Sequence, residues 1–525
     1  MKGFNLFYCL LVFTLGTNLA FSHAASKKIK SHSSEIRNKI SNNQTDTLSP
    51  VLPGAQLPFQ VVIENANFQL PVGFHSGVVG TFKGLWVFIA GRTNGLHGFN
   101  ATGNFPPDSQ NTSIYVVNPI TGQVVSRSLN DVSSGLTQQQ IDSLSVTSPQ
   151  GYQEANTIIM TGGYGVDTAT NTFGTKPVLT AIYLPGIVDW VMQTGNKNNS
   201  VAKNIRQIYD PLFQVTGGEM FKLGQVTQLV FGQNFTGEYT DGGNGDYIEQ
   251  VRRFEIINTP KNFAFKMLPS QPNYRDPNFR RRDLNVLPTL LNNNGRLQYG
   301  LIAYAGVFTE DTGVWTVPVV INGMTNPTMA DPSSPNTFKQ AMNHYVSASA
   351  SLYSRRLTSM YHIFFGGISY GFYSGGTFQT DNEIPFINQV TTVRLDQNGN
   401  FSQYFMNNQY PTIASTGSNP GNTLLFGAGA YFITNPISQY ANGVINLDNI
   451  RKPMVIGYIV GGIQSTLPNT NVMSDSAGSP YVFKVTLIPT SFAARETAAQ
   501  SLKQRVADHV ALLKQQIFPN LMHSK

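Results

Sequence analysis

Cysteine is almost absent from the chain: among 525 residues only Cys9 carries a thiol. Cys9 lies inside an apolar run from Phe4 to Leu15, which follows Lys2 and precedes small residues at Ser22–Ala24. This pattern predicts a secretory signal peptide over residues 1–24. The mature chain then has no thiol, which excludes disulfide bonds, thiolate metal sites and a cysteine nucleophile.

A long hydrophobic run is also lacking, because the Phe4–Leu15 run is too short to cross a bilayer comfortably. No stable membrane span is therefore expected. Residues 25–57 are rich in Ser, Lys, Asn, Gln and Thr and then contain Pro50 and Pro53, which predicts a flexible basic and polar leader. Together with the signal peptide, this indicates an exported protein, either periplasmic or extracellular.

Charged residues are scarce, at 12% of the chain, although the formal net charge is +7. Much of that excess lies in the leader, and no basic strand with interleaved aromatic residues follows, so no nucleic-acid partner is expected. The other dense basic cluster is Arg280–Arg282. We interpret it as a solvated loop, with an anion-binding site as the alternative.

What the chain has in abundance is a short apolar run that ends in glycine. The clearest copy is Met360–Gly367, MYHIFFGG. Such runs fit strands buried on both faces, and the glycine allows a sharp turn. The other copies are 85–91, 157–163, 227–232, 301–306 and 456–462. After a loop, a further strand follows most copies, at 113–118, 177–184, 249–256, 316–321, 388–395 and 481–488.

Each unit therefore predicts a small antiparallel sheet within a repeat architecture. In the second unit, Val188–Met192 is expected to be the outer strand. The last unit has no outer strand after residue 488, whereas Phe59–Glu64 is a solitary alternating strand ahead of the first unit. We expect these two ends to share one sheet, which would close the repeats into a ring.

The repeats resemble the kelch repeat of β-propeller proteins over residues 59–489. The resemblance rests on a Gly-Gly pair, a variable loop, a strand with an aromatic residue and an outer strand; the pair is complete at 162–163, 366–367 and 461–462. It implies an all-β propeller over residues 58–489 with six blades, or seven if Leu424–Ile433 forms a compressed unit. Residues 490–525 are expected to form an amphipathic helix and tail, because apolar residues recur there at spacings of three and four.

The loops that follow the glycine turns are expected to open on one face of such a ring, where binding residues concentrate. They are rich in aromatic and amide side chains, which suits a glycan or a polar peptide segment. The candidate ligand-binding residues are Arg92, His97, Glu238, Tyr239, Asp241, Glu310, Asp311, Tyr370, Asp381 and Glu383.

The acidic residues of these loops allow two more specific sites. Glu238, Asp241 and Asp246 could bind Ca²⁺, but a solvated acidic turn is favoured because no known loop signature is present. Two of the four carboxylates of Glu310, Asp311, Asp381 and Glu383 could act as general acid and base if they faced one cleft. The histidines have no metal-ligand spacing, and His362 is expected to be a buried core residue, so neither a metal nor a cofactor is expected.

The sequence therefore favours an exported kelch-like β-propeller that binds a glycan or protein partner through loops on one face. The alternative is a carbohydrate-active propeller enzyme, a hydrolase, lyase or epimerase-like protein, that uses carboxylates at the mouth of the ring. An enzyme should gather charged groups in one deep pocket, whereas a binding module should present a broad aromatic surface. Neither a catalytic residue nor an oligomeric state is assigned.

Overall fold

The computed structural model describes residues 48–195, 198–240, 245–293 and 296–490. The expected signal peptide, most of the leader and the expected C-terminal helix lie outside the described residues. Residues 310–313 group separately and are described by themselves as an exposed turn. The remaining described residues belong to one compact unit. In the described part of the chain no helix is both long and apolar enough to cross a bilayer.

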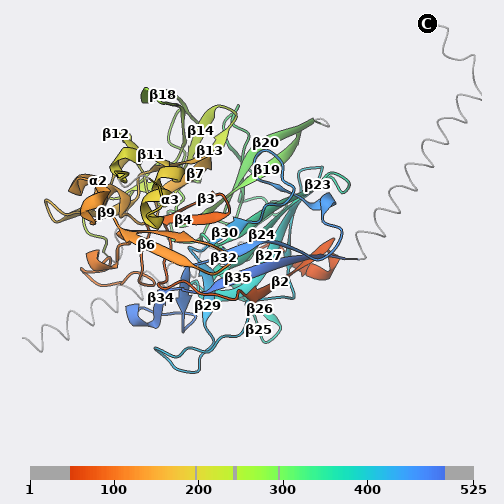
Figure 1. The fold of residues 1–525 in the computed structure, drawn as a ribbon. Coiled ribbons are helices and arrows are strands. Elements are labelled where there is room, and N and C mark those ends of the chain that lie inside the picture. The colour runs from red at the N-terminus through yellow and green to blue at the C-terminus, as the bar shows by residue number, and fades with distance from the viewer. Residues whose placement is uncertain (1–47, 196–197, 241–244, 294–295, 491–525) are drawn as a thin grey trace, which may run out of the picture. The chain divides into compact units, whose positions relative to one another are not determined.

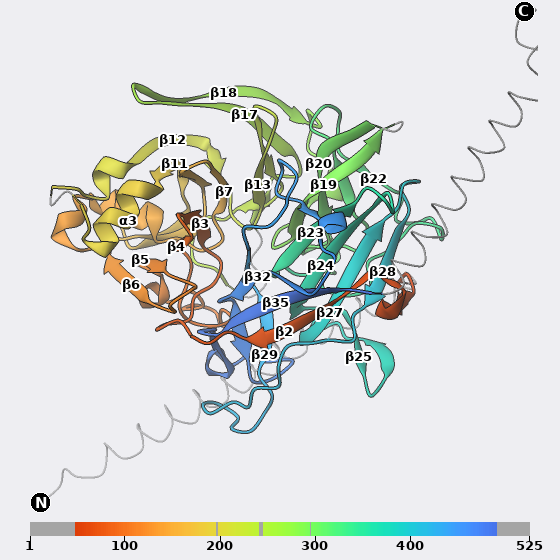
Figure 2. The same ribbon diagram turned by 45° about the vertical axis from the view of Figure 1, so that its right-hand side comes forward.

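The unit is all-β, and its strands form six main sheets that follow one another along the chain (Figures 1 and 2). Sheet 1 consists of β3 (Val78–Phe82), β4 (Leu85–Ile89), β5 (Ser113–Val117) and β6 (Val124–Ser128). Sheet 2 consists of β7 (Gln150–Glu154), β8 (Thr157–Thr161), β11 (Pro177–Tyr183) and β12 (Ile205–Gln214). Sheet 3 consists of β13 (Glu219–Leu223), β14 (Val226–Val230), β17 (Val251–Thr259) and β18 (Asn262–Gln271).

The second half of the chain repeats this plan. Sheet 4 consists of β19 (Asn285–Asn293), β20 (Arg296–Tyr304), β21 (Val319–Ile321) and β22 (Thr328–Met329). Sheet 5 consists of β23 (Ser349–Ser354), β24 (Ser359–Ile368), β27 (Phe386–Leu395) and β28 (Phe401–Phe405), extended in parallel by β31 (Ile445–Asn446) and β1 (Val51–Pro53). Sheet 6 consists of β30 (Tyr431–Thr434), β32 (Met454–Val460), β35 (Val482–Pro489) and β2 (Phe59–Asn65).

Smaller strands occupy the loops between the second and third strands of four sheets and the connection into sheet 6. They are the hairpins β9 (Tyr164–Asp167) with β10 (Thr172–Thr175), β15 (Gln233–Asn234) with β16 (Asp246–Tyr247), and β25 (Gly371–Ser374) with β26 (Thr377–Thr380), and the sheet of β29 (Leu425–Ala428), β33 (Ile463–Ser465) and β34 (Ser476–Gly478). The segment Leu424–Ile433 thus divides between β29 and β30. No seventh four-stranded sheet forms within the described residues.

The predicted pairing of the two ends is confirmed. Strand β2 pairs antiparallel with β35, from Phe59 opposite Pro489 to Asn65 opposite Phe483, and Figure 2 shows β2, β35 and β32 side by side. In β2 the side chains of Phe59, Val61 and Ile63 are buried, while the residues between them are only partly buried. This alternation of period two fixes the register, because a shift by one residue would expose all three apolar side chains.

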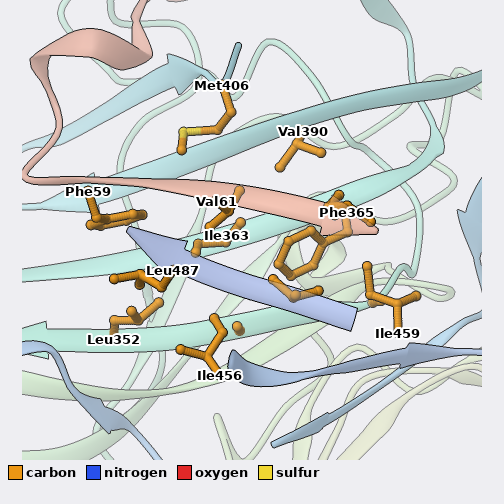
Figure 3. Packing of buried hydrophobic residues seen from close by; sticks show 14 of the residues in the cluster. Phe59, Val61, Leu352, Ile363, Phe365, Val390, Met406, Ile456, Ile459 and Leu487 are labelled. Atoms are coloured by element: carbon orange, nitrogen blue, oxygen red, sulfur yellow. The ribbon is translucent and has the colours of Figure 1, made fainter. Parts of the chain in front are cut away.

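Apolar side chains join each sheet to the next. One buried cluster lies between sheets 5 and 6, where Phe59, Val61 and Leu487 face Ile363 and Phe365 (Figure 3). Equivalent clusters lie between sheets 1 and 2, 2 and 3, 3 and 4, and 4 and 5. A sixth cluster joins sheet 6 back to sheet 1, with Phe74 and Phe88 beside Ile433 and Val460. The packing is therefore cyclic.

The backbone closes the same cycle. A single residue ahead of the first strand of each sheet donates its amide hydrogen to the carbonyl oxygen of the equivalent residue of another sheet, at distances of 2.7 to 3.3 Å. Each of these residues precedes its strand by two or three positions. We call this set the central circle; in order of donation it runs Ser76, Gly429, Val346, Asp283, Gly217, Ser148 and back to Ser76.

Gly162, which directly follows the second strand of sheet 2, is a position where only glycine fits. Its φ is +64°, and a Cβ atom there would lie 1.8 Å from the carbonyl oxygen of Val215. Gly163, which follows, donates its amide hydrogen to that same oxygen at 2.8 Å. A side chain at Gly162 would therefore break the link between sheet 2 and the segment that enters sheet 3.

Two α-helices are present among the described residues, and one corrects the sequence prediction. Val188–Met192 is not the outer strand of the second unit, because it belongs to α3 (Leu184–Met192); the outer strand is β12. Pro185 starts α3 at a position where its missing amide hydrogen costs nothing. The other helix is α2 (Gln138–Leu144), which begins with a capping box at Thr137.

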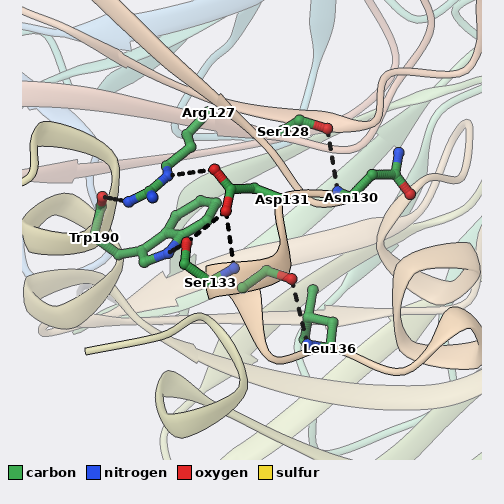
Figure 4. A network of polar contacts seen from close by, with 8 residues as sticks. Arg127, Ser128, Asn130, Asp131, Ser133, Leu136 and Trp190 are labelled. Atoms are coloured by element: carbon green, nitrogen blue, oxygen red, sulfur yellow. Dashed lines mark hydrogen bonds and ion pairs between the residues drawn. The ribbon is translucent and has the colours of Figure 1, made fainter. Parts of the chain in front are cut away.

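A polar clamp holds α3 against sheet 1 (Figure 4). The guanidinium of Arg127, on β6, lies 4.6 Å from the ring of Trp190 and donates a hydrogen bond to the Trp190 carbonyl oxygen at 2.9 Å. Its Nε donates to Asp131 at 3.1 Å. Ser133 donates to the same carboxylate and accepts a hydrogen bond from the Trp190 indole at 3.1 Å.

Candidate functional site

Two cavities meet the central circle, and all six of its residues line both of them. The first, which we call the loop cavity, has a volume of about 80 Å³. It is lined by loop residues of sheets 1, 2, 3 and 6 and by residues close to the circle. The second, which we call the strand cavity, has a volume of about 370 Å³ and is lined by the first strands of the sheets.

The polar centre of the loop cavity is the ion pair between Arg282 and Asp283. Both side chains are buried, and the guanidinium donates a hydrogen bond to the Asp283 carboxylate. Arg282 also donates from Nε to the hydroxyl of Tyr247 at 3.2 Å and lies 5.2 Å from the ring of Phe308. Burial lowers the pKa of Arg282, but Asp283 raises it, and the resulting pKa lies well above the usual value. Arg282 therefore stays charged.

A second arginine, Arg92, lines the cavity without a carboxylate partner among the described residues. Its side chain is 2% exposed. The guanidinium donates to Asn94 Oδ1 at 3.0 Å and to the carbonyl oxygen of Pro106 at 2.9 Å, and it lies 4.9 Å from the ring of Phe105. Burial lowers its pKa to about 10, so Arg92 stays charged at neutral pH. It supplies a positive charge fixed by neutral acceptors.

Two histidines beside the arginines are neutral. Burial lowers the pKa of His75 to about 3 and that of His97 to about 4. His75 Nε2 lies 3.0 Å from the carbonyl oxygen of Asn94, and His97 Nδ1 lies 2.8 Å from that of Gly98. A carbonyl oxygen only accepts, so these nitrogens carry the hydrogens and the other nitrogen of each ring is an acceptor.

Aromatic rings from three loops meet around His97. The ring of Tyr239, from sheet 3, lies 4.7 Å from His97 and 5.3 Å from Phe105 in the loop of sheet 1. Tyr164, from sheet 2, lies 5.4 Å from Phe105 and 5.7 Å from Phe235. Its hydroxyl donates to the carbonyl oxygen of Gly237 at 2.8 Å and accepts from the amide of Tyr239 at 2.9 Å. The cavity wall thus combines fixed rings with hydrogen-bonding groups.

Three of the residues proposed from the sequence, Arg92, His97 and Tyr239, line the loop cavity. Glu238 is exposed, and its carboxylate accepts a hydrogen bond from the Gly103 amide. Asp241 lies outside the described residues. The three-carboxylate calcium site receives no support, because Asp246 is paired with Arg275 at 2.7 Å and no described group of His, Cys, Asp and Glu is placed to hold a metal ion.

The remaining candidates do not line the loop cavity. Tyr370 donates its amide hydrogen to His344 Nδ1 at 3.1 Å. Asp381 accepts from Asn469 Nδ2 at 2.9 Å and from the Glu383 amide at 2.9 Å, and Glu383 is exposed. Glu310 and Asp311 lie in the exposed turn described separately above. A general acid and base drawn from these carboxylates is therefore not found in the cavity.

The solvated-loop interpretation of Arg280–Arg282 is wrong for its last two residues. Arg281 is 0% exposed; its guanidinium donates to the Val317 carbonyl oxygen at 2.9 Å and lies 4.5 Å from the Trp315 ring. Arg282 enters the ion pair described above. Sequence reasoning also missed Asp283, His75, Tyr164 and Tyr345. One signal was available in the sequence. Ser76, Asp283 and Val346 each stand two or three residues before the first strand of a sheet, and His75 and Tyr345 come directly before Ser76 and Val346.

Comparisons with known proteins give little. No family model matches the sequence, and no curated protein matches it. The chain is similar to the solved structure of YjhT, with 10% sequence identity and a TM-score of 0.39 over 80% of this chain and 98% of that one. A likeness at this level carries no argument about function. The class that the structure defines is an all-β protein of six cyclically packed sheets.

Proposed function

We propose that the chain is an exported, six-bladed kelch-like β-propeller that binds a glycan in the loop cavity. The cyclic packing of the six sheets and the central circle support the propeller, because both return from the last sheet to the first. The strand pair β2–β35 supports it further, since one sheet then contains both ends of the repeat region.

One observation carries the glycan proposal: the rings of Phe105, Tyr164 and Tyr239 enclose the same cavity as Arg92 and His97. An aromatic ring stacks on the apolar face of a sugar, while guanidinium and neutral imidazole groups bond to hydroxyl oxygens and hydrogens. Because Arg92 and His97 are held by neutral carbonyl and amide oxygens, they are already oriented before a ligand arrives. Such preorganisation reduces the entropy lost on binding.

The shape of the site favours a glycan over a protein partner. A stable protein interface buries about 800 Å² on each side and presents a broad surface. The groups gathered here instead surround a cavity of about 80 Å³. A cavity of this size admits part of a small ligand, such as one edge of the terminal residue of a sugar chain, and does not admit a folded surface.

The carboxylates favour binding over hydrolysis. Glycoside hydrolysis commonly needs two carboxyl groups about 5–10 Å apart. Asp283 is the one acidic residue among the described residues that line the loop cavity, and Arg282 holds it in an ion pair. The second candidate is a lyase or epimerase-like enzyme, which Asp283 favours because it places one carboxylate beside neutral imidazoles.

A glycan array probed with the mature full-length chain tests the proposal, followed by calorimetry on the best ligand. Removing the ring in Tyr239→Ala should weaken binding about tenfold, the equivalent of ~1.4 kcal/mol. The matched control is Tyr299→Ala, because Tyr299 is 47% exposed and does not line the cavity. Equal affinity of the two variants, or no glycan binding by the wild-type chain, would overturn the proposal. Conversion of the bound glycan, followed by NMR, would instead establish the enzyme.

A further inference from the structure

The strand cavity lies against the central circle, and the six circle residues are the lining that it shares with the loop cavity. Its walls come from the first strand of every sheet and are mainly apolar, with Val78, Leu287 and Pro288 among them. Three aromatic residues, Phe221, Tyr431 and Phe432, line it as well. Its volume of about 370 Å³ is room for an organic molecule rather than for a few water molecules.

One carboxyl group lies in this apolar cavity without a partner. Glu219 and Phe221 are two positions apart on β13 and line the cavity, while Met220 between them is buried in the core of sheets 2 and 3. Within the described residues the Glu219 carboxyl makes neither a hydrogen bond nor an ion pair. A carboxyl group in apolar surroundings is costly unless a partner compensates it, so the arrangement points to a ligand that supplies one.

The other ionisable groups of the cavity are already engaged. Asp283 pairs with Arg282, and the hydroxyl of Tyr431 accepts a hydrogen bond from the Gly77 amide at 2.5 Å. At the far end of β13, Lys222 pairs with Glu154. No cation among the residues that line the cavity is therefore available to Glu219.

A second unsatisfied polar group lines the same cavity. Ser347 is 5% exposed, and its hydroxyl has no hydrogen-bond partner. Ser347 follows the circle residue Val346, and Glu219 stands two positions after the circle residue Gly217. The Ser347 hydroxyl is itself enclosed by protein, so the Glu219 carboxyl is the acceptor that the cavity offers to a ligand.

We propose that the strand cavity binds an organic ammonium ion, a primary amine on an apolar body, with Glu219 as its counter-ion. An ammonium group has three donors and no acceptor, which matches a carboxylate that has no other partner. Its apolar body would pack on the valine, leucine and proline side chains, and the rings of Phe221 and Phe432 add cation–π attraction. A Ca²⁺ ion needs six to eight oxygen ligands, which these walls do not offer.

Proton release should accompany binding. Burial raises the pKa of Glu219 to about 8, so at neutral pH most molecules carry a proton on this carboxyl. An ammonium ion selects the ionised form, and its affinity should therefore rise as the pH rises from 6 to 8. This dependence separates the inference from simple filling of an apolar cavity.

Calorimetry on the mature full-length chain tests it, with benzylammonium chloride as the probe and benzyl alcohol as its neutral analogue. We expect benzylammonium to bind at least tenfold more tightly at pH 8 than at pH 6, and benzyl alcohol to show no such change. Glu219→Gln should bind benzylammonium at least tenfold more weakly than the wild-type chain. Glu255→Gln, on β17 of the same sheet, should leave it unchanged, because the Glu255 carboxylate faces Lys266 at 3.8 Å and does not line the cavity.

Three outcomes would overturn the proposal. Equal binding of benzyl alcohol would show a purely apolar cavity. Displacement by equimolar K⁺ or Na⁺ would show an inorganic cation site. If Glu219→Gln still bound benzylammonium and had a circular dichroism spectrum like that of the wild-type chain, Glu219 would not be the counter-ion. If that variant does not fold, Phe221→Leu provides the second arm, and it should weaken benzylammonium binding severalfold because it removes a ring that lines the cavity.

Discussion

The amide nitrogen of Ser76 lies 3.3 Å from the carbonyl oxygen of Gly429 and donates a hydrogen bond to it. This contact joins the entrance of sheet 1 to the entrance of sheet 6 and completes the central circle. A second closure, between β2 and β35, uses a whole strand pair inside sheet 6. The first closure depends on backbone groups alone, whereas the second depends on side chains that can be changed one at a time.

Phe59 tests the strand closure. Its side chain is 0% exposed and its ring lies 5.4 Å from that of Tyr361 in sheet 5. Phe59→Ala should lower the free energy of unfolding by about 3–5 kcal/mol, because it removes a large buried ring and leaves a cavity. Ile120→Ala, at a position 85% exposed, should change it by less than about 0.5 kcal/mol. Urea unfolding measures both, and similar values for the two variants would contradict the packing.

Gly162 and Gly224 separate backbone strain from steric conflict. Both have a φ of +64°, but a Cβ at Gly162 would lie 1.8 Å from Val215 O, while one at Gly224 would meet nothing within 4 Å. Gly224→Ala should cost about 1–2 kcal/mol, the price of a left-handed conformation. Gly162→Ala should cost at least about 3 kcal/mol, since overpacking is added. Equal shifts in urea midpoint would show that the close approach is unimportant.

Glu219 should make stability depend on pH. Burial raises its pKa from 4.5 to about 8. Between these values the folded chain holds a proton that the unfolded chain has released, so stability falls as the pH rises from 4.5 to 8. Glu219→Gln has no such proton, and its advantage over the wild-type chain should grow across this window. Urea midpoints at pH 5, 6.5 and 8 measure it; parallel curves would contradict the prediction, and Glu255→Gln is the control.

Asp131 should act in the opposite direction, at acid pH. Hydrogen bonds from Ser133, followed by that from Arg127, lower its pKa from 3.8 to about 2. The stabilisation is present above pH 3.8 and is lost as the pH falls through 2. Thermal midpoints should therefore converge between the wild-type chain and Asp131→Asn on acidification. Asp189→Asn, an exposed position on α3, should not converge in this way, and a constant gap for Asp131→Asn would show that the clamp does not control the carboxyl.

Binding in the loop cavity should be insensitive to pH from 5 to 8. The pKa values of His75 and His97 lie at about 3 and about 4, so both rings are neutral throughout this range. Calorimetry with the glycan found on the array should give one dissociation constant across it. A transition centred near pH 6.5, the ordinary histidine value, would show that at least one ring titrates as if exposed.

The repeats made much of the fold predictable from the sequence. The second strands are nearly continuous apolar runs; in β24 all ten residues are buried. The place of β2 followed from counting, because the last unit lacked a strand. Helix α3 was missed because its apolar residues also fit a short strand. Leu184, Ile187, Val188 and Val191 recur at helical spacing, with Pro185 in the first turn, and that signal would have identified the helix.

The site was less predictable, for a physical reason. Arg92, His97 and Tyr239 lie in the loops after the glycine turns, and the sequence predicted binding residues in these loops. Asp283 lies instead in a segment that enters a first strand. Its importance depends on the circle, which brings together residues from six distant parts of the chain. Buried arginines are equally hard to predict, since Arg281 donates to the distant carbonyl oxygens of Ala305 and Val317 as well as to that of the nearby Asn278.

The pairing of β2 with β35 has a consequence for how the protein is made. Synthesis proceeds from the N-terminus, so β2 emerges hundreds of residues before the strand that it pairs with. Throughout that interval its amide and carbonyl groups are open to any passing chain, as those of an edge strand are. A polypeptide truncated before Val482 keeps this exposed template permanently, together with the bare edge of β32. Premature termination should therefore yield aggregates instead of a smaller folded product.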